Sequence, residues 1–137
     1  MTNEMKNSKG LNIGLWAAQI LLAAAFGLFG SMKASQPLDQ LAGMMTWIPT
    51  MSPTFVRTLG TLEVLGAIGL ILPSLTRIMP RLTVAAALCL VVLQVLAIGL
   101  HVSRGEFIAL PLNAVLILLA AFVLWGRSKK VVITARG

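Results

Sequence analysis

The segment LTVAAALCLVVLQVLAIGLH, Leu82–His101, contains no Asp, Glu, Lys or Arg. Its length is close to the ~20 residues with which an α-helix crosses the apolar core of a bilayer. A segment surrounded by hydrocarbon must satisfy its own backbone hydrogen bonds, so this run is predicted to be a helix rather than a strand. Similar runs lie elsewhere in the chain, and the sequence predicts four membrane-spanning helices at about Leu11–Lys33, Thr54–Leu72, Leu82–His101 and Phe107–Gly126.

The composition agrees with a membrane protein. Hydrophobic residues make up 58% of the 137 residues, charged residues make up 11%, and the mean hydropathy is +0.92. Because an average soluble domain carries ~25% charged residues, this chain cannot build a water-facing surface. The net charge of +7 does not indicate nucleic acid, since the basic residues lie between and after the apolar runs. The partner that composition predicts is therefore the lipid bilayer.

The distribution of basic residues predicts an orientation. With four spans, both termini share one side with the connection between the second and third spans. That side holds eight basic residues and the other side holds three, so the positive-inside rule places both termini in the cytoplasm. Lys6 and Lys9 before the first run are typical of a signal peptide, but the run continues to Gly30 without a polar stop, so we expect a retained first helix.

Short connections predict an all-α bundle with up-down-up-down topology and one membrane domain, 11–126, flanked by an N-terminal tail, 1–10, and a basic C-terminal tail, 127–137. The longest connection, 34–53, is expected to carry a short apolar helix after Pro37 that lies in the interface or caps the bundle. Pro73 is expected to stop the second helix. Cys89 is expected to be a small buried apolar side chain, and it has no second cysteine for a disulfide.

Polar residues within or beside the spans are the candidate site, because such residues are costly in lipid. Several recur on one face of a helix: Gln94 and His101 are seven residues apart, as are Glu106 and Asn113 if the fourth helix extends back past Pro111. We therefore expect a polar pocket, biased toward the outer side, formed by Gln19, Lys33, Arg57, Glu63, Gln94, His101, Glu106 and Asn113.

Glu63 is the most informative of these residues. A carboxylate near the middle of a span either stays protonated or finds a cation, and Lys33 from the first helix is the favoured partner. Two interpretations stay open: the polar residues hold the helices together, or they form a ligand-binding or proton-handling pocket. A metal site is poorly supported, because His101 is the single histidine and Met44, Met45 and Met51 are better explained as apolar packing.

The order of these residues resembles the DoxX-like family of small four-helix bacterial membrane proteins. The resemblance covers about Leu11–Arg127, and it rests on this ordered set: Trp16-x-x-Gln19, Gly30-x-x-Lys33, Gly60-x-x-Glu63-x-x-Gly66, Leu72-Pro73, His101, Arg104-Gly105-Glu106, Asn113 and Gly126-Arg127. It implies a multi-pass bundle in the inner membrane. It implies no single reaction, because members include subunits of a thiosulfate:quinone oxidoreductase, companions of a thiol-related detoxification complex, and distant animal relatives that resemble assembly chaperones.

Three functions follow as hypotheses. The favoured one is a binding or accessory module, in which the pocket holds a lipophilic or quinone-like molecule or the bundle holds a membrane partner protein. The second is a quinone-linked oxidoreductase subunit in which Glu63 or His101 carries protons. A transporter or channel is third, since four short helices leave little room for alternating access unless the protein forms a homo-oligomer. No catalytic residue is assigned, no cofactor other than a quinone is suggested, and enzymatic activity stays open.

Overall fold

A computed structural model of the protein describes residues 3–45 and 48–133. The described chain is all-α. Four long apolar helices pack as a bundle, and a short helix follows the first of them, which confirms the predicted fold class. The elements are α1 (Asn3–Ser35), α2 (Leu38–Met44), the 3-10 turn η1 (Ile48–Thr50), α3 (Pro53–Thr76), α4 (Arg81–Ser103), the 3-10 turn η2 (Phe107–Ala109), α5 (Leu110–Trp125) and the π-helical turn η3 (Gly126–Lys130).

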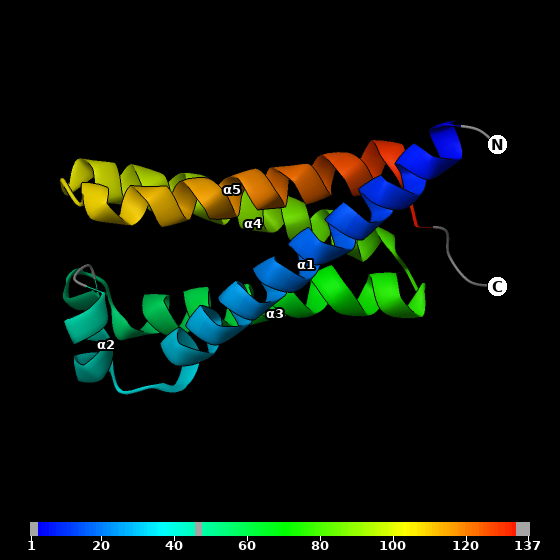
Figure 1. Cartoon of the computed structure of the whole chain (residues 1–137). Coiled ribbons are helices and arrows are strands. Elements are labelled where there is room, and N and C mark those ends of the chain that lie inside the picture. Colours follow the sequence, from blue (N-terminus) through cyan, green and yellow to red (C-terminus); the bar gives the residue numbers. More distant parts are fainter. Residues whose placement is uncertain (1–2, 46–47, 134–137) are drawn as a thin grey trace.

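Consecutive long helices run in opposite directions, so α1 begins and α5 ends at the same end of the bundle (Figure 1). We call this the terminal end, and it also holds the turn between α3 and α4. The opposite end, which holds α2, η1 and η2, is the loop end. α1, α3, α4 and α5 each contain a segment long and apolar enough to cross a membrane.

The helix ends follow local sequence signals, with one exception. Ser52 caps α3 by accepting a hydrogen bond from the Phe55 N–H at 3.1 Å, and Pro53 stands in the first turn. Pro111 likewise lies in the first turn of α5, where its missing N–H costs nothing. Pro73 was expected to stop α3, and this prediction is wrong. The helix passes through Pro73 and ends after Thr76, where Arg77 adopts a left-handed conformation.

α1 crosses the bundle obliquely (Figure 1). Near the loop end it touches α3 so closely that a Cβ atom on Gly60 would lie 2.6 Å from the Gly30 carbonyl oxygen and the Ala34 nitrogen. Near the terminal end it touches α5, where a Cβ on Gly14 would lie 3.7 Å from the Phe122 ring. α1 is therefore held against α3 at one end and against α5 at the other.

Small and branched apolar side chains fill the middle of the bundle. This core comprises Ala18, Leu22, Phe26, Ala67, Leu70, Ala87, Leu90, Leu116, Ala120 and Val123. A second cluster lies at the loop end, where Leu41 of α2, Ile48 and Val56 are buried. Met45 and Met51 pack against this second cluster. The short helix therefore caps the loop end of the bundle.

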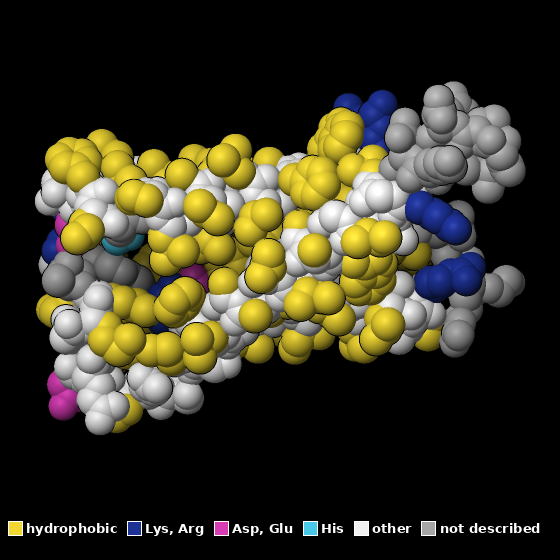
Figure 2. All heavy atoms as spheres, viewed as in Figure 1, with side chains coloured by type: hydrophobic (Ala, Val, Ile, Leu, Met, Phe, Trp, Pro, Cys, Tyr) yellow, Lys and Arg dark blue, Asp and Glu magenta, His cyan; other side chains and the backbone are white. Residues whose placement is uncertain are grey.

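The outer surface of the long helices is also apolar (Figure 2). Cys89, which was expected to be buried, is exposed on this surface. The physical reason is that lipid is as apolar as the core, so an apolar side chain gains nothing by pointing inward. Polar side chains, in contrast, do gain by pointing inward. The buried polar residues among those described are Gln19, Lys33, Glu63, Ser74, Thr83, Gln94, Asn113 and Arg127.

Candidate functional site

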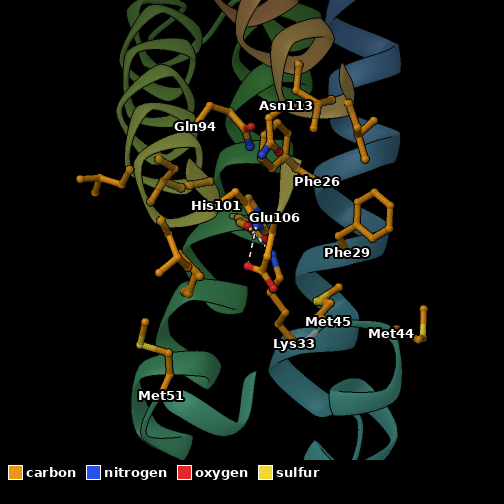
Figure 3. A pocket seen from close by; sticks show the side chains of 18 of the residues that line it. Phe26, Phe29, Lys33, Met44, Met45, Met51, Gln94, His101, Glu106 and Asn113 are labelled. Atoms are coloured by element: carbon orange, nitrogen blue, oxygen red, sulfur yellow. Dashed lines mark hydrogen bonds and ion pairs between the residues drawn. The ribbon is translucent and has the colours of Figure 1, made fainter. Parts of the chain in front are cut away.

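A cavity of about 690 Å³ lies inside the bundle toward the loop end. All four long helices contribute to it, and most of its wall is apolar. Six polar residues also line it: Lys33, Glu63, Gln94, His101, Glu106 and Asn113. In Figure 3, Gln94, Asn113 and Phe26 lie at one end of the cavity and Met44, Met45 and Met51 lie at the other, with the charged residues between them. Since the methionines come from the capping segment, the amides mark the deep end.

Lys33 and Glu63 form an ion pair across α1 and α3. The Lys33 Nζ donates to Glu63 Oε1 at 2.8 Å and to Oε2 at 3.0 Å, and the two residues are 9% and 5% exposed. This is the pairing that the sequence favoured. It occurs one helical turn from the contact of Gly30 with Gly60, which brings the two backbones close enough for the side chains to meet.

A second polar cluster lies where the two loop-end connections meet. Glu106 Oε1 lies 3.2 Å from His101 Nδ1 and accepts a hydrogen bond from Arg104 Nε at 3.0 Å. Arg104 Nη1 also lies 3.4 Å from Thr50 Oγ1 in η1, a distance at the long limit for a hydrogen bond. Together these contacts tie the turn after α4 to the capping segment. His101 and Glu106 of this cluster line the cavity, as does Met44 of α2.

Gln94 and Asn113 contribute the unsatisfied polar atoms of the cavity. Gln94 Oε1 and Asn113 Nδ2 are buried and have no hydrogen-bond partner. Their residues are 5% and 8% exposed. An acceptor from α4 and a donor from α5 are thus unbonded and covered by protein, while their residues line the deep end of the cavity (Figure 3).

Two of the eight predicted polar residues lie outside the cavity. Arg57 Nη1 donates to the carbonyl of Lys33 at 3.0 Å, so it satisfies one of the carbonyl groups left open in the last turn of α1. Gln19 is fully buried near the terminal end, where its Nε2 donates to the Leu70 carbonyl in the turn before Pro73. The expected single polar seam is therefore two separate regions, because α1 carries Gln19 far from the loop end.

Arg127 is the residue whose role the sequence did not reveal. It was assigned to a basic tail, but it is 2% exposed, in the π-helical turn that continues α5. Its Nε donates to Gln19 Oε1 at 2.7 Å, its Nη1 donates to Asn12 Oδ1 at 2.8 Å, and its Cζ lies 5.6 Å from the centre of the Trp16 ring. The available signal was Asn12 and Gln19, which are seven residues apart on one face of α1. This cluster locks the terminal end and does not line the cavity.

The cavity opens through the side of the bundle. Figure 2 shows a hollow at the loop end between the surfaces of α1 and α5, with Lys, acidic and His side chains visible inside and hydrophobic side chains around it. The hollow follows from the oblique course of α1, which leaves α5 as it approaches α3.

The described part of the cavity wall carries several kinds of polar group. They are carboxylates, an imidazole, an ammonium group and carboxamides. Across residues 3–45 and 48–133, no three His, Cys, Asp or Glu side chains gather as they would around a metal ion. Glu63 and Glu106 are each held by a cation or an imidazole.

These features define a multi-pass membrane protein whose four-helix bundle contains a largely apolar cavity with several polar residues in its wall. A more particular assignment comes from a family comparison. The model of the DoxX-like family matches residues 17–123, which include every residue of the cavity, so the chain belongs to the DoxX-like family. No curated protein and no solved structure matches the chain.

Proposed function

We propose that this protein binds a lipophilic small molecule, which enters the cavity sideways from the bilayer. The observation that carries the proposal is the cavity of about 690 Å³ with apolar walls and a polar interior. Small-molecule sites typically occupy ~300–1,000 Å³ and combine an apolar lining with a few polar groups that fix orientation.

The side opening supports a ligand that dissolves in lipid. At the loop end, the contacts of Arg104 with Glu106 and Thr50 tie the turn after α4 to η1, so we expect entry from water to be hindered there. The hollow between α1 and α5 offers a route that breaks none of these contacts (Figure 2). A lipophile already concentrated in the membrane would reach the cavity by lateral diffusion.

Structural bracing alone explains the polar residues less well. The Lys33–Glu63 pair and Arg57 do brace α1 against α3, but Gln94 and Asn113 each leave a buried polar atom unbonded. A brace whose polar atoms are unbonded costs stability rather than adding to it. Their position on the cavity wall supports a ligand as the missing partner.

Native mass spectrometry of the protein released from its own membranes tests this proposal. An Ala97→Phe variant would fill part of the cavity, whereas Val95→Phe adds the same ring at a residue of the same helix that is 54% exposed. We expect an adduct of several hundred daltons on the unmodified protein and on Val95→Phe, and its loss from Ala97→Phe. An adduct retained equally by both variants, or no adduct even after incubation with excess lipid extract, would contradict the proposal.

We also propose that the terminal end faces the cytoplasm. Lys9, Arg77, Arg81, Arg127, Lys129 and Lys130 all lie at that end in or beside the helix ends, whereas Lys33, Arg57 and Arg104 lie toward the loop end. The positive-inside rule then supports a cavity in the outer half of the membrane.

A further inference from the structure

We infer that the cavity selects a ligand whose head group is uncharged and both donates and accepts a hydrogen bond, such as the hydroxyl of a long-chain alcohol or a primary carboxamide. The side-chain carboxamides of Gln94 and Asn113, which line the cavity, are the groups that recognise it. This inference rests on the proposed function and specifies the chemical class of its ligand.

The positions of the two amide side chains support this inference. Gln94 lies on α4 and Asn113 on α5, and both line the deep end of the cavity (Figure 3). Both are more than nine-tenths buried, at 5% and 8% exposure. The two residues therefore border the same space from neighbouring helices.

The hydrogen-bonding groups of Gln94 and Asn113 indicate the kind of head group. Gln94 Oε1 can only accept a hydrogen bond and Asn113 Nδ2 can only donate one, and neither is bonded. In a membrane an unbonded buried polar atom is especially unfavourable, because no solvent replaces the missing partner. A hydroxyl group that donates to the Gln94 carboxamide oxygen and accepts from the Asn113 carboxamide N–H would satisfy both once the two side chains turn toward the cavity.

The charged residues of the cavity argue against a charged head group. Glu63 already holds both its oxygens on Lys33, and Glu106 is engaged by His101 and Arg104. The charges that line the cavity are thus matched among themselves. A carboxylate or ammonium group placed at Gln94 and Asn113 would be an additional buried charge facing only neutral amides, which is costly within a membrane.

The apolar lining of the cavity indicates the nature of the rest of the ligand. Phe26, Leu93 and Leu116 line the cavity, and so do Leu112 of α5 and Ile108 of η2. A chain attached to the head group would pass along this wall and leave between α1 and α5 into lipid. The ligand is accordingly an amphiphile that inserts head first.

Photolabelling tests the inference. The purified protein in nanodiscs is labelled with an alkyl diazirine that carries a terminal hydroxyl, and labelled residues are mapped by mass spectrometry. Competitors are 1-dodecanol, dodecyl methyl ether, dodecanoate and dodecylammonium, compared at equal mole fraction in the membrane. The ether accepts a hydrogen bond but cannot donate one, so it isolates the contribution of Gln94.

We expect labels on cavity residues, and competition by the alcohol on the order of tenfold stronger than by the ether or by either charged amphiphile. The Gln94→Met/Asn113→Leu double variant, of similar volume, should bind the alcohol and the ether equally. Val115→Leu, at a residue of α5 that is 53% exposed, should keep the preference. If the double variant does not fold, Gln94→Met alone should remove the difference between alcohol and ether.

Failure of the inferred head group and failure of the proposed function would give different results. Cavity labelling with equal competition by alcohol and ether, or with stronger competition by a charged amphiphile, would overturn the assigned head group and leave the proposed function standing. Labels confined to the outer surface of the helices would overturn both. The comparison of competitors on the unmodified protein decides the matter independently of any variant.

Discussion

Lys33 and Glu63 form a buried ion pair whose partners come from different helices. Removing one partner of such a pair leaves an uncompensated charge, which typically costs about 3–5 kcal/mol. We therefore expect Lys33→Met to lower the thermal stability of the detergent-solubilised protein strongly. The Lys33→Met/Glu63→Leu double variant should recover most of the loss, because it buries no charge. Thermal unfolding of the two single variants and the double variant measures this coupling, and a Lys33→Met protein as stable as the unmodified one would contradict it.

The individual residues also show how far sequence reasoning reached. Glu63 and Lys33 could be paired because a carboxylate within an apolar run either stays protonated or finds a cation, and few cations were available. Arg57 was misplaced in the cavity because its direction around α3 depends on where α1 ends. Arg127 was missed because a basic residue just after a span is normally solvated, and only the π-helical turn directs it inward.

At the scale of the helices, the crossing of α1 and α3 depends on Gly60. A Cβ there would lie 2.6 Å from backbone atoms of α1, which cannot move aside as a flexible side chain does. We expect Gly60→Ala to separate the two helices and to destabilise the protein by about 1–3 kcal/mol, as overpacking does.

Gly99→Ala is the matched control for this substitution. It is a glycine in α4 whose Cβ would meet nothing within 4 Å. It should be neutral or slightly stabilising, since alanine favours helix by up to ~1 kcal/mol over glycine. Thermal unfolding of both variants, side by side, checks the pair of predictions, and equal stabilities would show that the crossing tolerates a methyl group.

The elements themselves were largely predictable, because length and hydropathy dominate in a membrane. The ends of the helices were less predictable from the sequence. α3 continues past Pro73 because a proline near the end of a helix removes only one hydrogen bond, and Gln19 uses a carbonyl group of that same turn. The oblique course of α1, which creates the side opening, has no signal in the apolar pattern. It depends on which glycines happen to face each other.

For the molecule as a whole, the proposed orientation can be measured directly. In a Cys89→Ala background, Gln40→Cys reports on the loop end and Ser128→Cys reports on the terminal end, and both side chains are exposed. We expect a membrane-impermeant maleimide added to intact cells to label Gln40→Cys and not Ser128→Cys. Both should react after permeabilisation. The reverse pattern would place the termini outside.

The fold class, the family and six of the eight cavity candidates followed from sequence, because polar residues inside apolar runs are rare and conspicuous. The shape of the cavity did not follow, because a volume of about 690 Å³ arises from the angle between helices rather than from any residue type. The same angle separated Gln19 from the residues with which it had been grouped.

The side opening has a consequence for lipid asymmetry. It lies in the loop-end half of the bundle (Figure 2), while in the terminal-end half Arg127 is hydrogen-bonded to Gln19 and Asn12 of α1. An amphiphile that enters by this opening is therefore drawn from a single leaflet of the bilayer. Molecules in the opposite leaflet would have to cross the membrane before the protein could take them up, so its occupancy would report the composition of one monolayer alone.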